Sequence, residues 1–119
     1  MRYVDGFVLS VPKKNLAAYR RMAAKAGKIW REHGALEYVE AAGDDLAVKF
    51  GLPFPKMVKP KTGETVVFSY IVYKSKADRN KINAKVMKDP RLASSMNPNA
   101  MPFDPKRMAY GGFKAIVDL

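Results

Sequence analysis

Cysteine is absent from the sequence, and histidine and tryptophan occur once each. Without cysteine the chain has no disulfide bond, no thiolate metal site and no cysteine nucleophile. The single histidine, His33, lacks the cysteine or second histidine that a typical zinc site requires. We therefore expect no bound metal and no cofactor. We also expect a cytoplasmic location, because disulfides are rare in the cytoplasm.

Long apolar runs and phosphate-binding motifs are also absent. No stretch approaches the roughly 20 apolar residues that a membrane-spanning helix needs. The apolar run near the N-terminus is interrupted by Asp5 and Gly6, so we expect no signal peptide. There is no P-loop, no glycine fingerprint for a dinucleotide and no carboxylate cluster suited to Mg²⁺. We therefore predict neither membrane insertion nor nucleotide binding.

Acidic residues are scarce, since 11 of them stand against 22 lysines and arginines, and the formal net charge is +11. Such a charge suggests binding to nucleic acid or another polyanion. However, most of the cations are lysines scattered along the chain, without an arginine-rich run or a helix-turn-helix pattern. We interpret the charge as a solvated surface, because charge alone gives only nonspecific affinity. Nucleic acid is thus not the expected partner.

The stretch Glu64–Tyr73 gives the strongest strand signal. It is almost wholly β-branched or aromatic, contains no glycine or proline, and follows the turn Thr62-Gly63. Such a run predicts a central strand that is covered on both faces. Residues 2–10 also alternate as a strand with apolar residues on both faces. We expect Val11-Pro12 to end this first strand, because proline cannot donate to the ladder.

A long helix is predicted from Asn15, as its N-cap, to about His33. Gly34 provides the usual left-handed stop, and Gly27 within the helix indicates close packing. The apolar residues recur at spacings of three and four, which gives the helix one apolar stripe. The stripe consists of Leu16, Tyr19, Met22, Ala23, Ala26, Ile29, Trp30 and His33.

The middle of the chain contains a second predicted strand, 35–42, and an irregular stretch, 46–63. The irregular stretch holds several prolines and large apolar residues, so we expect part of it to pack against the domain. After the central strand, Ser75 is predicted to cap a second helix that ends at Asp89-Pro90. The buried face of this helix is expected to hold Ile82, Val86 and Met87.

The C-terminal part is predicted as a short helical turn at 91–96, a loop at 97–102 and a last strand at 108–117. Gly111-Gly112 lies in the middle of that strand. Glycine at such a position indicates a bulge or a close approach of another group to the backbone.

The predicted order is strand, helix, strand, strand, helix, strand. This is the ferredoxin-like βαββαβ arrangement of the α+β class, and residues 1–119 form a single such domain. Crossovers of one hand place both helices on one face of a four-stranded antiparallel sheet. The strands carry large apolar residues on both faces, and a monomer rarely exposes such a surface. We therefore predict a symmetric homodimer in which two copies press these faces together.

Three segments resemble a bacterial family of unknown function, the YbaA-like proteins. They are Tyr3–Val8, Asn83–Arg91 and Met101–Phe113, and the resemblance extends over nearly the whole chain except residues 46–61 and the tail. The resemblance implies a dimeric α+β barrel, the fold shared with cofactor-free monooxygenases of antibiotic synthesis and with chlorite dismutases. It implies no particular reaction, because a fold alone does not supply one.

Asp5 and His33 are the candidate catalytic residues. Asp5 lies between two aromatic residues on an apolar strand face, where a carboxylate without a partner could act as a general base. The alternative is an ion pair with Arg107 or a contact across the dimer. His33 ends the apolar stripe at the helix C-terminus, where the helix dipole favours its cation. The alternative there is a purely structural histidine.

Further residues are candidates for ligand binding in a cleft between the sheet and the helices. Asn83 is near the buried side of its helix and could bind a ligand or bond to its own helix backbone. Arg107 could hold an anion or pair with Asp104. Aromatic residues with one polar end suit the wall of a cleft, although they are also common in cores. The set is Ser69, Tyr70, Asn83, Arg107 and Tyr110.

We therefore predict a small dimeric protein that binds a small hydrophobic or aromatic molecule in this cleft and that could act as a cofactor-free enzyme. Two alternatives stay open. One is a structural or regulatory interaction module in which the dimer itself is the product. The other is a weak, nonspecific polyanion binder that uses the basic surface.

Overall fold

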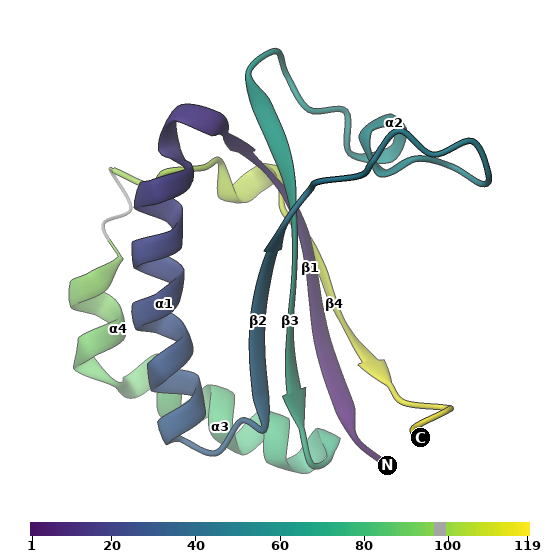
Figure 1. The fold of residues 1–119 in the computed structure, drawn as a ribbon. Coiled ribbons are helices and arrows are strands. Elements are labelled where there is room, and N and C mark those ends of the chain that lie inside the picture. Colours follow the sequence, from purple (N-terminus) through teal and green to yellow (C-terminus); the bar gives the residue numbers. More distant parts are fainter. Residues whose placement is uncertain (97–99) are drawn as a thin grey trace.

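The computed structural model describes residues 1–96 and 100–119 (Figure 1). Residues 97–99 of the predicted loop lie outside the described residues. Within the described ranges, no helix has both the length and the apolarity that crossing a membrane requires. The elements in chain order are β1 (Tyr3–Pro12), the 3₁₀ turn η1 (Lys13–Asn15), α1 (Leu16–Glu32), β2 (Glu37–Ala42), α2 (Phe54–Val58), β3 (Glu64–Tyr73), α3 (Lys76–Lys88), α4 (Pro90–Ser95), η2 (Pro105–Arg107) and β4 (Ala109–Lys114).

The strands form one four-stranded sheet in the order β2-β3-β1-β4, with every pair antiparallel. β1 and β3 lie in the centre and pair from Tyr3 opposite Tyr73 to Pro12 opposite Glu64. This confirms the ferredoxin-like βαββαβ topology of the α+β class, with β3 as a central strand. β1 runs on to Pro12, beyond its predicted end, because the missing N–H of proline is harmless at the last position of a strand.

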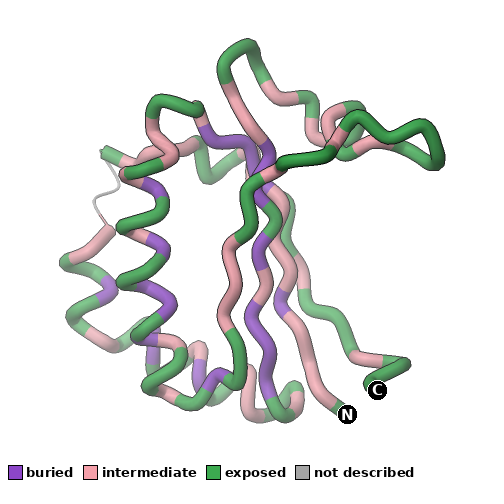
Figure 2. The backbone as a smooth tube through the Cα atoms, viewed as in Figure 1, coloured by how far each residue is buried: buried purple, intermediate pink, exposed green. Residues whose placement is uncertain are grey.

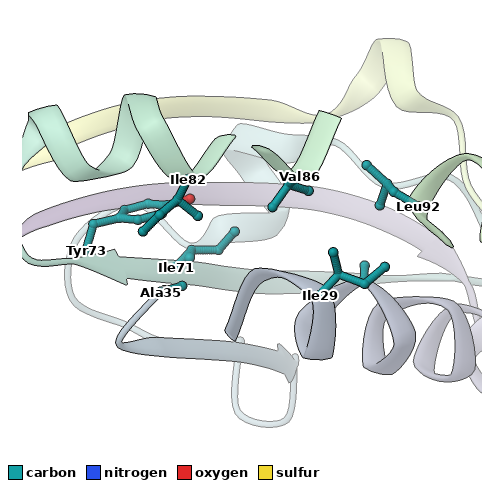
Figure 3. Close-up of a cluster of buried hydrophobic side chains, with 8 residues drawn as sticks. Ile29, Ala35, Ile71, Tyr73, Ile82, Val86 and Leu92 are labelled. Atoms are coloured by element: carbon teal, nitrogen blue, oxygen red, sulfur yellow. The ribbon is translucent and has the colours of Figure 1, made fainter. Parts of the chain in front are cut away.

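The helices α1, α3 and α4 lie against one face of the sheet, which we call the inner face (Figure 1). Side chains alternate along each strand, so Leu9, Val67 and Ile71 share this face and are buried there. Ile82 and Val86 are buried as predicted, whereas Met87 is exposed because it lies on the side of α3 away from the sheet. The cluster drawn in Figure 3 joins β3 to the three helices through Ile29, Ala35, Ile71, Tyr73, Ile82, Val86 and Leu92.

The opposite face, which we call the outer face, has no such cover of helices among the described residues. The segment between β2 and β3, residues 43–63, projects from this side, and we call it the arm (Figures 1 and 2). Phe54 of the arm packs near Phe68 of β3, with ring centroids 6.5 Å apart, so part of the segment packs down as predicted. Phe50, by contrast, is 95% exposed. The exposed apolar side chains on the strands of this face are Ala41, Phe68, Ala109 and Phe113.

Two local predictions are confirmed only in part. Asn15 stands directly before α1, as predicted, but its side chain makes no capping hydrogen bond, and its amide instead donates to the carbonyl of Pro102 at 3.1 Å. The reason is that Asn15 is the last residue of the 3₁₀ turn η1, which leads directly into α1. The backbone of this turn replaces the usual capping geometry at Asn15. Gly111-Gly112 forms no bulge, because the register of β4 against β1 is unbroken. The close approach is present, since a Cβ on Gly112 would lie 2.5 Å from the hydroxyl of Tyr3.

Other local predictions are confirmed. The hydroxyl of Ser75 accepts a hydrogen bond from the backbone N–H of Asp78 at 3.1 Å and so caps α3. Gly34, with φ of +118°, follows α1 in a conformation that favours glycine. Gly27 allows close packing, because a Cβ there would lie only 2.6 Å from the ring of Tyr38. This contact brings α1 against β2, where the candidate site is formed.

Candidate functional site

A cleft lies on the inner face between α1 and the strands β2 and β3. It consists of two adjoining cavities of about 360 Å³ and about 170 Å³. Binding sites for drug-sized molecules occupy roughly 300–1,000 Å³, so the larger cavity falls within that range. The cavities share Tyr19, Ala23, Tyr38 and Glu40 as lining residues. These four residues define what we call the cleft centre.

A carboxylate held by two phenols is the main polar group of the cleft centre. The hydroxyl of Tyr19 donates to Oε1 of Glu40 at 2.6 Å, and that of Tyr38 donates to Oε2 at 2.8 Å. Tyr38 and Glu40 are two residues apart on β2 and therefore point to the same face. Tyr19 reaches them from the apolar stripe of α1. Three side chains from two elements thus converge at one point.

The two phenols remain protonated donors. Burial is the largest cause that raises the pKa of Tyr19 and of Tyr38 well above the ordinary tyrosine value, and the neighbouring Glu40 raises both further. A carboxylate that accepts at both oxygens is in the arrangement expected for its ionised form. Each oxygen keeps further lone pairs, so Glu40 can accept another hydrogen bond from a ligand.

Aromatic rings and methionines surround the smaller cavity. The ring of Trp30 lies 6.2 Å from that of Tyr38, and the ring of Phe103 lies edge-on to Tyr19 at 5.5 Å. Methionine adapts its shape to different apolar partners, so this wall can fit more than one small molecule. The remaining aromatic and sulfur-containing lining residues are Phe7, Met22, Met96 and Met108.

Asn83 belongs to a polar cluster beside the cleft. Its Oδ1 accepts hydrogen bonds from Nε1 of Trp30 at 3.0 Å and from the hydroxyl of Tyr73 at 3.1 Å. Burial raises the pKa of Tyr73, and the nearby Asp5 carboxylate raises it further. Asn83 therefore uses its oxygen to fix Trp30, which lines the smaller cavity, and it does not line either cavity itself.

Asp5 forms a buried ion pair, but with a different partner from the one considered above. Asp5 is 4% exposed, and its Oδ1 lies 3.2 Å from Nε of Arg79 on α3. The guanidinium of Arg79 also lies over the ring of Tyr3, 4.9 Å from its centroid, and donates to the Tyr3 hydroxyl at 3.3 Å. The suggested pairing with Arg107 is wrong, because Arg107 lies near the start of β3. Asp5 lines neither cavity.

Arg107 and His33 form ion pairs away from the cleft. Both terminal nitrogens of Arg107 donate to the carboxylate of Glu64 at 2.8 Å, and this bidentate contact lowers the pKa of Glu64 to about 2. Nε2 of His33 lies 2.9 Å from Oδ2 of Asp89. Hydrogen bonds from Arg91 and then from His33 hold the pKa of Asp89 well below its usual value. His33 thus belongs to a charged cluster at the end of α1.

The remaining candidates fall in different places. Ser69 is buried opposite Glu40 in the sheet and lines the smaller cavity. Tyr70 lies on the outer face, since it alternates with Ser69. Tyr110 lies on the edge strand β4, largely exposed, and its ring stacks on Phe7 at 5.6 Å. Of the sequence candidates, Ser69 is the one that the structure brings to the cleft.

The cleft centre was missed by sequence reasoning, although a signal was present. Tyr19 belongs to the predicted apolar stripe of the helix, and Tyr38 and Glu40, two residues apart, share one face of the predicted strand 35–42. A carboxylate between apolar residues on a buried face needs a donor, and a tyrosine on the facing helix is the natural one.

In the described ranges, no group of three or more metal-ligating side chains is positioned to hold a metal ion.

Comparison with solved structures places this chain among the ferredoxin-like α+β proteins. A proposed antibiotic biosynthesis monooxygenase from Nitrosomonas europaea matches with a TM-score of 0.63 and 14% identity, over 97% of this chain and 90% of that one. SnoaB, a cofactor-independent oxygenase from Streptomyces nogalater, matches with a TM-score of 0.57 and 12% identity, over 99% of this chain and 96% of that one. A dimeric ferredoxin-like protein from an uncultured marine organism matches with a TM-score of 0.59 and 10% identity, over the full length of both chains. Such low identities establish the fold alone.

The sequence comparison is more specific. The chain is 48% identical over 118 residues to an uncharacterised protein of Escherichia coli K12, YbaA, and the alignment covers 99% of both chains. The family model described as a protein of unknown function, DUF1428, matches residues 2–105. The chain therefore belongs to this family, and the predicted resemblance to YbaA-like proteins is confirmed.

Proposed function

We propose that this protein binds a small hydrophobic or aromatic molecule in the cleft between α1 and the sheet. The observation that carries the proposal is the composition of the cleft. Its walls are apolar and aromatic, and a few polar groups, Tyr19, Tyr38, Glu40 and Ser69, converge within it. An apolar hollow with a few convergent polar groups is the usual form of a small-molecule site.

Cofactor-free chemistry on such a ligand is the activity that best fits these groups. Glu40 is an acceptor that could take up a proton from a bound ligand, and the two phenols that donate to it would hold its carboxylate in position. SnoaB, a cofactor-independent oxygenase with a similar fold, supports this proposal. Asp5 and His33 are each held in ion pairs outside the cleft, so we move the proposed catalytic role to Glu40.

We further propose that two copies associate through their outer faces. Phe68 and Phe113 are exposed on this face, on the two strands that flank β1, and the arm projects beside it. Burying about 800 Å² on each partner is typical of a stable interface. The dimeric neighbour from a marine organism supports association into a dimer. A cytoplasmic location stays a prediction.

Tryptophan fluorescence offers a direct test of the cleft. Trp30 is the single tryptophan and lines the smaller cavity, so its emission should change when an aromatic probe enters. We would titrate phenols, quinones and aromatic amines into the native protein and into Ala23→Leu, in which a larger side chain occupies both cavities. Ala17→Leu on the exposed side of α1 is the matched control.

Saturable emission changes in the native protein and in Ala17→Leu, but not in Ala23→Leu, are the expected result. If Ala23→Leu is poorly folded, Ala42→Leu at the exposed rim of the larger cavity replaces it. Probes that bind all variants equally, or none at all, would remove the cleft as the functional site. The interaction-module alternative, favoured by the uncovered outer face, would then become the leading hypothesis.

A further inference from the structure

We propose that the cleft selects organic cations, namely amines or quaternary ammonium compounds that carry one ring-sized apolar body. This inference rests on the proposed ligand-binding function of the same cleft and names the chemical class that it takes. Three features support it: the Glu40 carboxylate without a cationic partner, the aromatic rings around it and the size of the smaller cavity.

Glu40 differs from most of the other carboxylates that are withdrawn from solvent. Asp5 is paired with Arg79, Glu64 with Arg107, and Asp89 with Arg91 and His33. Glu40 has no cationic side chain within salt-bridge distance among the described residues, although the protein has a net charge of +11. Asp78, in the first turn of α3, is also half-buried and has no salt bridge, so Glu40 is the half-buried acid without a cation that lies inside the cleft.

The two phenols satisfy the hydrogen bonding of Glu40 but not its charge. Tyr19 and Tyr38 are neutral donors, so they bring no positive charge to the carboxylate that lies next to the apolar walls. Withdrawing such a charge from water is unfavourable unless an opposite charge accompanies it. A bound ammonium group would supply that charge, and an anionic ligand would add to the repulsion.

The rings around the cleft centre favour a cation for a second reason. The face of an aromatic ring is negative, and a cation within about 6 Å of the ring centroid is attracted to it. Tyr19, Tyr38, Trp30 and Phe103 are neighbours in two contacting ring pairs around the smaller cavity. Arrays of this kind bind ammonium groups by contact with several ring faces.

The basic surface does not cancel this preference. Arg20 is the one cationic residue among those lining the larger cavity, and its side chain is exposed. No lysine or arginine is among the described residues lining the smaller cavity. At physiological ionic strength exposed charges are screened over about 8 Å, whereas groups inside the cleft are screened much less.

The size of the smaller cavity limits the apolar part of the ligand. A cavity of about 150 Å³ holds a benzene molecule, so about 170 Å³ accommodates a single ring. The larger cavity adjoins it at Glu40 and leaves room for a charged chain or substituent. A ring attached to a short ammonium chain therefore matches both the shape and the charge of the cleft.

The test compares three probes of similar size: 2-phenylethylamine, which is cationic, 2-phenylethanol, which is neutral, and 3-phenylpropionate, which is anionic. Binding is followed by calorimetry and by the emission of Trp30. We expect the amine to bind about tenfold more tightly than the alcohol, and the carboxylate to bind weakest. In Glu40→Gln the preference for the amine should disappear. It should persist in Glu37→Gln, which removes an exposed carboxylate from the same strand.

The possible outcomes separate this inference from the proposed function. If the alcohol or the carboxylate binds the native protein as tightly as the amine, the cleft is a ligand site but selection for cations is wrong. If none of the probes binds, the selection for cations and the proposed ligand-binding function of the cleft are both wrong. The comparison of probes needs only the native protein, so it decides the inference even if Glu40→Gln is unstable. An amine preference that survives in a folded Glu40→Gln would also overturn the role of Glu40.

Discussion

Along β3, successive residues of one strand meet two different environments. Val67, Ser69 and Ile71 point to the inner face and are buried beneath the helices, while Phe68 points to the outer face and is exposed. The inner face buries several polar groups, including Asp5 and Ser69. The outer face leaves large apolar groups in water. The usual distribution of polar and apolar side chains is thus partly reversed between the two faces.

This contrast has a physical explanation. The helices bring partners to the polar groups of the inner face, as Arg79 does for Asp5 and Tyr19 does for Glu40. Buried polar groups are tolerated when they are paired in this way. The outer face receives no comparable layer of helices within one chain. Val66 and Val72 of this face are buried, but Phe68 and Phe113 stay exposed, which is unfavourable for apolar side chains. One face is complete within the protomer, and the other is suited to a second protein surface.

The largest expected effect on the free energy of unfolding comes from truncating a buried side chain of the inner face. Leu9 is 1% exposed, and truncating a buried leucine to alanine typically costs about 2–5 kcal/mol. We expect Leu9→Ala to lower the free energy of unfolding by about 3 kcal/mol in urea denaturation. Val8→Ala, one residue away on the outer face, should cost less than about 1 kcal/mol in dilute solution. Equal losses would contradict the difference between the faces.

Breaking the buried ion pair of the inner face comes next. Arg79→Met leaves the Asp5 carboxylate buried without its cation, and such losses cost about 3 kcal/mol. The double variant Asp5→Asn with Arg79→Met removes both charges and should be clearly more stable than Arg79→Met alone. Thermal or urea unfolding of the three proteins measures the coupling. Additive losses would show that the two groups act independently.

A charge on the outer face should act on assembly instead of folding. Phe113 is 62% exposed, so Phe113→Glu should leave the protomer folded. We expect the dissociation constant of the dimer to rise about 30-fold in analytical ultracentrifugation, which corresponds to about 2 kcal/mol. Met87→Glu, at a similarly exposed site on α3, is the control and should have no effect. A native protein that sediments as a 13.3 kDa monomer would refute the proposed dimer.

The smallest effect concerns the ion pair that closes one end of the sheet. The pKa of Glu64 is lowered from 4.5 to about 2 by Arg107, so the ionised form stabilises the folded state. This contribution is complete above pH 4.5 and is lost as the pH falls toward about 2. Glu64→Gln should therefore melt a few degrees below the native protein at pH 7. The difference should vanish near pH 2, and a constant difference would exclude the pair as its cause.

The sequence predicted the fold because the pattern of strands and helices was regular. The β-branched run of β3 and the apolar stripe of α1 each determine which side of an element is buried. The proposed outer-face contact followed from the same pattern, since apolar residues alternate onto both faces of β1 and β3. The failure at Asn15 reflects a local competition, because a 3₁₀ turn replaced the expected capping geometry.

The candidate site was harder to predict because it depends on distances between elements. Asp5 was correctly expected to be buried, but its partner lies on α3, and the sequence does not reveal which of many cations reaches it. Glu40 was placed on the correct strand, yet its role depends on two phenols, one of which lies 21 residues away on a helix. Long-range pairings of this kind are set by tertiary packing, which local patterns do not encode.

Gly27 links the architecture of the protein to its chemistry. The ring of Tyr38 occupies the space where a side chain at position 27 would stand. A relative that carries alanine at this position therefore needs a smaller residue opposite it, and would then lose one of the hydroxyls that hold Glu40. The two positions should vary together among homologues, and their joint identity would indicate which members of the family keep this site.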